Sequence, residues 1–426
     1  MDLESLTERV VPAATHFYAV GEDIGGPAIV RVYNEDGSPA RAITPYAPGF
    51  TGGARVATGD VTGDGTDDVV IAPGPGGGPE IKVYDGVSGA LVRDFFAYDP
   101  GFAGGVNVAV GDVNGDGKGD IITGTGVGGG PNVKVFDGQT GGLLDSFFAY
   151  ESSFRGGVNV GAGDVNGDGK ADIISGTGVG GGPRVQVFDG ATGASIGNFF
   201  AYDPGVRSGV TVAAGDLSGT GKADIVTGVG FGGGPNVKVF DGQTGGLLDS
   251  FFAYDPGFLG GVSVEVVHAN GANDILVAPG PSAGGYVELF NGATGGLVGL
   301  FQPFPAFTGG ITTGQGVATA VAPFSNVFAK LLPVANPLPP GGSSNDSGPD
   351  PVPDNTYIPS FDLGYIPTTP DTGYIPPDTG YTPPDSGYTP PDTGSYDSGS
   401  SSDFVDPGPC GCGDSGGFVD LGDTGF

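Results

Sequence analysis

A repeat of 52 residues constrains this chain more than any other feature of its sequence. Four aspartates mark the period at equal intervals of 52 residues: Asp60, Asp112, Asp164 and Asp216. A full unit reads GGVNVAVGDVNGDGKGDIITGTGVGGGPNVKVFDGQTGGLLDSFFAY. Five units, the outer two looser than the rest, begin at Gly52, Gly104, Gly156, Ser208 and Gly260. A fixed period of this length indicates one supersecondary unit used again and again.

Each unit contains four strand-like runs separated by turn signals. In the unit quoted above, VNVAVGD and NVKVFDG alternate, DIITGTG is rich in β-branched residues, and LLDSFFAY ends in aromatics. The segments NGDG, GVGGGP and DGQTGG have the composition of turns. Four short antiparallel strands repeated radially are typical of a propeller blade. The sequence therefore predicts an all-β fold.

The two ends of the repeat region predict how the ring closes. Residues 16–46 match only the second, third and fourth strands of a unit, and a first strand reappears as GGITTGQGVATAVAP from Gly309. We therefore expect five whole units and one composite unit, a six-bladed β-propeller with strand-swap closure around Ile311–Val321. Such closure leaves no free edge within the ring. A parallel β-solenoid of calcium-binding nonapeptides is the alternative, but the chain has no nine- or eighteen-residue period.

The turn between the first and second strands carries the strongest chemical motif. It reads DVTGDGTDD from Asp60, DVNGDGKGD from Asp112 and DVNGDGKAD from Asp164. Oxygen-bearing side chains occupy positions one, three, five and nine, position seven offers its backbone carbonyl, and glycine at position six permits a sharp turn. Calcium takes about six to eight oxygen ligands, which a tightly wound acidic loop can supply.

The motif predicts three calcium sites and a weaker fourth. Counting the carbonyl at position seven, the candidate ligands are Asp60, Thr62, Asp64, Thr66 and Asp68, then Asp112, Asn114, Asp116, Lys118 and Asp120, then Asp164, Asn166, Asp168, Lys170 and Asp172. The fourth loop, DLSGTGKAD, keeps Asp216, Ser218 and Asp224 but has Thr220 at position five. The fifth, HANGAND from His268, has lost the first aspartate and two residues, so we expect no metal there.

The same loops are compatible with two other structures, an EF-hand and a metal-free turn. An EF-hand needs a glutamate at position twelve, where Ile71, Thr123 and Ser175 stand, and a following helix, for which DIITGTG is poorly suited. We therefore expect each loop to close a β-hairpin. A metal-free turn built from Asp, Asn and Gly would explain any single loop. Three loops with the same ligand spacing favour the metal.

These motifs resemble a known family of repeats. The DxNxDGxxD loops are similar to those of the FG-GAP repeats of integrin α-subunits and of the related VCBS repeats of bacterial surface proteins. The segment FGGGP at Phe231 is similar to the FG…GAP signature itself. The resemblance covers roughly residues 16–330 and implies a propeller that binds calcium. Members of the family adhere to proteins, bind sugars or scaffold lyases. Integrin propellers have seven blades, whereas six are counted here.

Antiparallel connections place the acidic loops on one face and the GxGGGPx and DPGF-like turns on the other. On that other face the frame is constant while the tips vary, with Arg155 and Arg207 at equivalent positions. Such variation is typical of a binding surface, and equally of neutral drift at exposed tips. The paired aromatics, such as Phe95 and Phe96 or Phe147 and Phe148, are expected to pack between blades.

The composition argues against several classes of partner and of function. The net charge is −33, from 48 acidic and 15 basic residues, which argues against nucleic acid and anionic membrane partners. No apolar stretch is long enough to span a bilayer. Neither His16 nor His268 has a repeated partner. We expect a non-catalytic adhesion or ligand-binding module that takes an extracellular protein or polysaccharide. The alternative is a polysaccharide lyase or hydrolase on the same scaffold.

The two flanking segments bear on location. Residues 1–15 lack the apolar core of a secretory signal, so no complete signal peptide is visible, although LESLTER followed by VPA resembles a short leader of exported bacterial proteins. Residues 331–426 contain fourteen Asp and no Lys, Arg or Glu, with YxPPDxG repeats at about 357–396. We expect a disordered, acidic, Pro-rich tail. It would serve as a spacer or as a cell-wall anchor, and the protein would be extracellular or on the bacterial cell surface.

The pair Cys410 and Cys412, separated by one glycine, leaves several interpretations open. A disulfide across a single residue would be strained. Intermolecular pairing, attachment to a metal or through a thioester, and free thiols are the alternatives.

Overall fold

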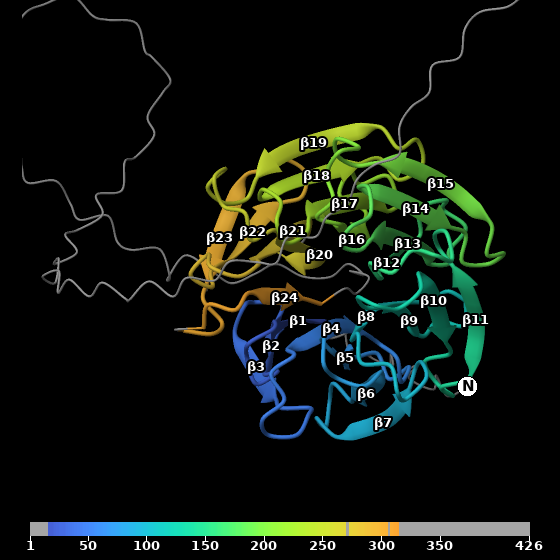
Figure 1. The fold of residues 1–426 in the computed structure, drawn as a ribbon. Helices are drawn as coiled ribbons and strands as arrows, with labels where there is room; N and C mark the ends of the chain where they lie inside the picture. The colour runs from blue at the N-terminus through green and yellow to red at the C-terminus, as the bar shows by residue number, and fades with distance from the viewer. Residues whose placement is uncertain (1–15, 270–271, 306, 315–426) are drawn as a thin grey trace, which may run out of the picture. The chain divides into compact units, whose positions relative to one another are not determined.

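The protein is a ring of six four-stranded antiparallel sheets (Figure 1). The computed structural model describes residues 16–269, 272–305 and 307–314. The first blade contains β24 (Ile311–Thr313), β1 (Phe17–Glu22), β2 (Val30–Asn34) and β3 (Pro39–Ile43). The predicted all-β, six-bladed propeller is therefore confirmed. Within the described ranges, no helix has the length and apolar character needed to cross a bilayer.

The other five blades each use four strands that are consecutive in the chain. Blade 2 contains β4 (Ala54–Gly59), β5 (Asp68–Pro73), β6 (Glu80–Tyr84) and β7 (Leu91–Phe96). Blade 3 contains β8 (Val106–Gly111), β9 (Asp120–Thr125), β10 (Asn132–Phe136) and β11 (Leu143–Phe148). Blade 4 contains β12 (Val158–Gly163), β13 (Asp172–Thr177), β14 (Arg184–Phe188) and β15 (Ser195–Phe200). Blade 5 contains β16 (Val210–Gly215), β17 (Asp224–Val229), β18 (Asn236–Phe240) and β19 (Leu247–Phe252). Blade 6 contains β20 (Val262–Ala269), β21 (Ala272–Pro279), β22 (Val287–Asn291) and β23 (Leu297–Phe301).

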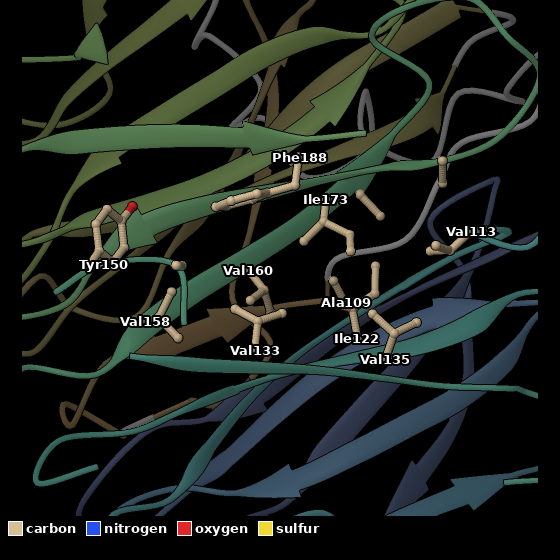
Figure 2. Close-up of a cluster of buried hydrophobic side chains, with 13 residues drawn as sticks. Ala109, Val113, Ile122, Val133, Val135, Tyr150, Val158, Val160, Ile173 and Phe188 are labelled. Carbon is tan, nitrogen blue, oxygen red and sulfur yellow. The ribbon is translucent and has the colours of Figure 1, made fainter. Parts of the chain in front are cut away.

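The core lies between blades. The second strand of a blade, such as β9 or β13, is buried along its whole length, whereas the outermost strand is mostly exposed. One core cluster joins Ala109, Ile122 and Val133 of blade 3 to Val160 and Ile173 of blade 4 (Figure 2). Because both faces of an inner strand are covered by neighbouring blades, its sequence is apolar on both faces rather than alternating.

The ring closes as the sequence predicts. Strand β24 pairs antiparallel with β1, with Ile311 opposite Glu22 and Thr313 opposite Val20. The hydroxyl of Thr312 also donates to the carbonyl oxygen of Ala54 in blade 2, at 2.7 Å. The predicted closing strand Ile311–Val321 is thus described as far as residue 314, and its remainder lies outside the described residues. The expected boundaries at 15/16 and 330/331, the tail and the cysteine pair lie at or beyond the edges of the described part.

The FFAY segment at the end of a unit connects one blade to the next. The ring of Phe95 in blade 2 lies against Phe136 in blade 3, with centroids 4.9 Å apart. The hydroxyl of Tyr98 donates to the carbonyl oxygens of Thr123 and Asn132 in blade 3, both at 3.0 Å. Equivalent bonds reach the next blade from Tyr150 and Tyr202. The repeat therefore encodes contacts between blades as well as within them.

The expectation for the paired aromatics is only half right. The first phenylalanine of each pair packs between blades, but the second, Phe96 or Phe148, is 53% or 57% exposed. Successive side chains of a strand point to opposite faces. The outermost strand has a neighbouring blade on one face and solvent on the other, so two adjacent phenylalanines cannot both be buried.

The tyrosine contact gives a direct test. We expect Tyr202→Phe to lower the free energy of unfolding by about 1–3 kcal/mol, because it removes a hydroxyl that donates to two strands of the next blade. Tyr286→Phe, at a side chain that is 44% exposed, is the matched control and should change little. Urea denaturation measures both, and equal stability of Tyr202→Phe and the wild type would contradict the contact.

Candidate metal loops and axial pocket

The acidic loops close β-hairpins, as predicted. The Asp60 loop joins β4 to β5, and Gly59 pairs with Asp68 at its base. The same register recurs in the next three blades, where Asp120, Asp172 and Asp224 pair with the glycine that ends the first strand. The last blade instead has a short hairpin in which β20 and β21 pair up to the turn. Its residues 270–271 lie outside the described residues.

Side-chain oxygens at positions one, three and five fold over the loop backbone. In the second loop, Asp112 accepts the amides of Gly115 at 2.7 Å, Asp116 at 3.1 Å and Gly117 at 2.8 Å. Asn114 accepts the amide of Asp116 at 2.8 Å, and Asp116 accepts that of Lys118 at 3.0 Å. The third loop repeats all of these bonds. The first loop repeats all except the bond to the side chain at position three, which is Thr62 there.

The fourth loop keeps part of this arrangement. Asp216 accepts the amides of Thr220 at 2.9 Å and Gly221 at 2.7 Å. Thr220 has no carboxylate to offer at position five, so this loop carries one acidic group fewer on its exposed side. The prediction that it binds a cation more weakly stays a prediction.

Position nine is buried and bound to backbone amides. Asp120 is 1% exposed and accepts the amides of Val113 at 3.0 Å, Asn114 at 3.1 Å and Gly138 at 3.1 Å. Asp68 and Asp172 make the equivalent three bonds. Burial raises the pKa of all three carboxyls to about 6, although the amide donors oppose this. Burial also raises the pKa of Asp224.

The amide bonds give position nine a structural role that its spacing does not reveal. Because Gly138 lies in the turn between β10 and β11, Asp120 holds the acidic loop to the turn between the third and fourth strands. In the last blade, whose loop has lost the metal spacing, Asp274 still accepts the amide of Gly292 at 3.1 Å. This role of position nine is therefore independent of the metal motif.

The donor set suits calcium, but the side chains do not all converge. Every candidate ligand is an oxygen, which fits a hard cation. In residues 16–314, apart from the three positions not described, no three His, Cys, Asp or Glu side chains gather into a metal-binding group. The half-buried carboxylate at position one and the exposed one at position five share a loop, while the carboxylate at position nine faces the protein interior. None of the ion pairs within the described part involves a candidate metal ligand.

A pocket of about 480 Å³ lies on the ring axis, at the face opposite the acidic loops. Turns that follow the second strand of each blade form its mouth. The mouth residues are Ile24, Pro75, Val127, Val179, Phe231 and Pro281. Four of them are large, apolar and half or more exposed, from 50% for Val179 to 65% for Phe231. One turn from each blade thus contributes to a single apolar rim.

A belt of polar side chains lies on the innermost strands below this rim. Its members occupy the second position of each first strand: Arg55, Asn107, Asn159, Thr211, Ser263 and Thr312. Asn107 donates to the carbonyl oxygen of Val158 at 2.8 Å, and Asn159 donates to that of Val210 at 2.7 Å. Both asparagines therefore bond the next blade.

The belt continues across the closure. Thr211 donates to the carbonyl oxygen of Val262 at 2.9 Å, and the hydroxyls of Ser263 and Thr313 lie 2.8 Å apart. Arg55 instead pairs with Asp23, at 2.7 Å. This pocket was not predicted from the sequence. A signal was present, because one polar residue stands second in every first strand, directly after an apolar one.

The variable arginines cap their own turns. Arg155 donates to the carbonyl oxygens of Ser152 and Phe154, and Arg207 donates to those of Pro204 and Val206. Both side chains remain at exposed tips of the face that carries the axial pocket. These bonds give both arginines a local structural role, and their part in binding stays a prediction.

Comparison with known proteins finds a family match over parts of blades 4 and 5. Residues 164–227 match the FG-GAP-like repeat family, which confirms the resemblance predicted from the loop motif. No curated protein matches the chain.

Several solved structures are similar. The rhamnogalacturonan lyase YesW matches with a TM-score of 0.38 and 16% identity, over 67% of this chain and 64% of the lyase. The Bacillus licheniformis rhamnogalacturonan lyase PL11 matches with a TM-score of 0.37 and 16% identity, over 72% and 71%. A protein of unknown function from Bacteroides caccae matches with a TM-score of 0.44 and 11% identity, over 70% and 98%. The chain thus covers slightly less than two thirds of YesW.

The two roles of aspartate in one loop can be separated by mutation. Without calcium, we expect Asp120→Ala to lower the free energy of unfolding by about 3 kcal/mol or more, because three amides lose their acceptor. Asp116→Ala, at an exposed position of the same loop, should cost less than about 1 kcal/mol under these conditions. Urea denaturation in the presence of a chelator measures both. Similar losses for the two variants would argue against the structural role of position nine.

Proposed function

Since residues 164–227 form an FG-GAP-like repeat within a closed six-bladed propeller, we propose that this chain is a calcium-binding, non-catalytic module that recognises an extracellular protein or polysaccharide. The observation that carries the proposal is the axial pocket. It combines an apolar rim with a polar interior, which is the usual character of a ligand site. Its six-blade construction fixes the rim residues on a rigid frame.

The chemistry of the pocket supports binding rather than catalysis. Its ionisable lining residues are Asp23 and Arg55, which pair with each other at 2.7 Å. The described lining contains no His, Cys, Lys or Tyr. Asn107, Asn159 and Thr211 use side-chain donors to hold neighbouring blades. The rim residues are therefore the groups most available to a ligand.

Calcium belongs to the opposite face in this proposal. The side chains at positions one, three and five and the carbonyl at position seven would hold it in the loops that begin at Asp60, Asp112 and Asp164, with a weaker site at Asp216. The ion supplies positive charge to carboxylates that no described ion pair compensates. Extracellular calcium modules bind at about 10⁻⁴–10⁻³ M.

Composition supports the proposed location. An excess of 33 negative charges suits a protein that gathers cations and disfavours nucleic acid. The acidic, proline-rich segment after residue 330 would act as a spacer or anchor at a bacterial cell wall, and it would hold the propeller away from the surface.

Metal dependence is the first test. We expect chelation to lower the melting temperature, because calcium bound only to the folded state contributes about 2.7 kcal/mol per site at a hundredfold excess over Kd, and less than this per site at millimolar calcium for a Kd of about 10⁻⁴–10⁻³ M. Magnesium should restore stability poorly, since it demands a tighter octahedral shell. Asp116→Ala and Asp168→Ala should each remove one site in a calcium titration. Identical melting curves with chelator and with millimolar calcium would refute the calcium part of the proposal.

Ligand binding at the pocket is tested separately. A glycan and matrix-protein array, probed with and without calcium, should give a ligand that is bound but not turned over. Phe231→Ala and Val179→Asp should weaken its binding by about tenfold or more, at an unchanged melting temperature. Val87→Asp, at a 66% exposed position on the acidic-loop face, is the control. Release of unsaturated sugar ends would instead favour the lyase alternative.

A further inference from the structure

Three loops have a lysine at position seven that extends over the loop of the preceding blade. These lysines are Lys118, Lys170 and Lys222. The carbon chain of each lysine lies on the glycine at position four, whose φ is positive. A Cβ added at Gly63 would stand 2.5 Å from Cε of Lys118. The equivalent separations are 2.8 Å for Gly115 with Lys170 and 2.6 Å for Gly167 with Lys222. The glycine leaves room for the lysine of the next blade.

The backbone holds consecutive loops together at the same points. The residue after each lysine donates its amide to the backbone carbonyl oxygen of the first aspartate of the preceding loop. These bonds run from Gly119 to Asp60, from Ala171 to Asp112 and from Ala223 to Asp164, each at 2.7 Å. A backbone hydrogen bond between neighbouring loops therefore fixes the position of each lysine.

The lysine accompanies the more acidic loops. The three loops that it covers all have a carboxylate at position five. The fourth has Thr220 there, and nothing lies within 4 Å of a Cβ added at its Gly219. At that junction the side chain of Asn273 donates to the carbonyl of Asp216 at 2.9 Å and replaces the backbone bond. The junction survives without the lysine, so the lysine is not required to join the blades.

We propose that Lys118, Lys170 and Lys222 are tethered counter-ions that determine the cation affinity of the loops beginning at Asp60, Asp112 and Asp164. Each ammonium offsets part of the charge of the preceding loop when no ion is present and opposes the entry of calcium. The affinity part of this inference rests on the proposed calcium function. The counter-ion part rests on the loop charges alone.

The contact is electrostatic rather than a direct ion pair. Among the described residues, no loop carboxylate lies within 4 Å of a lysine nitrogen. Lys170 also faces Asp189 of its own blade, whose pKa is lowered mainly by bonds from Thr192 and further by the ammonium. A unit charge several ångströms from a divalent ion in water-like surroundings changes its affinity by roughly three- to tenfold. Calcium can enter the loop without breaking a salt bridge.

Lys118→Met tests the proposal, because methionine keeps an apolar chain over Gly63 and removes the charge. We expect calcium titration by calorimetry at low ionic strength to show a three- to tenfold tighter site, and the gain to fade at high salt. The melting temperature in chelator should fall. Lys118→Arg keeps the charge and should behave like the wild type. In an Asp64→Ala background, which disables the covered loop, Lys118→Met should no longer change affinity.

A second lysine provides the matched control. Lys134 lies in β10, donates to the carbonyl oxygen of Ala97 at 2.9 Å and sits over the ring of Tyr98. Lys134→Met should lower the melting temperature without changing calcium affinity. This control shows whether a loss of stability alone can change the calcium affinity of the loops.

The outcomes separate this inference from the calcium function. If the wild type binds calcium and Lys118→Met binds it with the same affinity, the lysine proposal is wrong while the calcium function stands. If no variant binds calcium, the calcium function is wrong, and the melting temperature in chelator decides the counter-ion role. A lower value for Lys118→Met than for Lys118→Arg supports that role, and equal values overturn it.

Discussion

The pairing of β24 with β1 is the contact on which the rest of the molecule depends. Each blade is a small sheet whose two faces must be covered, and only a closed ring gives every blade two neighbours. Three residues of β24 complete the first blade, and Thr312 within them continues the polar belt to Ala54 of blade 2. The axial pocket exists because six inner strands surround one axis (Figure 1). Removal of β24 would interrupt both the polar belt and the apolar rim of the pocket.

Antiparallel connection then gives the two faces different chemistry. Turns after the first and third strands can only reach one face, and turns after the second and fourth strands can only reach the other. The first face gathers carboxylates at its exposed loops, and the second gathers Val127, Val179 and Phe231 around a pocket. A cation bound on one face can therefore stabilise the ring without occupying the site on the other. This separation is why the proposed metal and ligand functions can be tested independently.

Much of this architecture could be predicted from the sequence, because a period of 52 residues and a missing first strand leave few alternatives to a closed six-bladed ring. The hairpin geometry of the loops followed from glycine placement and from the lack of helix formers. The role of Asp120 could not be predicted, since an aspartate nine residues into a loop looks the same whether it accepts amides or binds a metal. The pocket was missed because Asn107 and its equivalents read as ordinary alternation within a strand. Burial of Phe96 was predicted wrongly because sequence does not say which face of an outermost strand meets solvent.

The distribution of residues at position seven supports the counter-ion interpretation from a different direction. Position seven is predicted to serve its own loop through the backbone carbonyl, which leaves its side chain free to serve a neighbour. The Asp60 loop follows the composite blade, where β24 and β1 come from opposite ends of the repeat region and no acidic loop joins them. In that loop position seven is Thr66 rather than lysine. Lysine is also missing after the Asp216 loop, where the last blade has a shortened hairpin. It is thus found only where an acidic loop with a carboxylate at position five precedes it, as expected if its charge serves that loop.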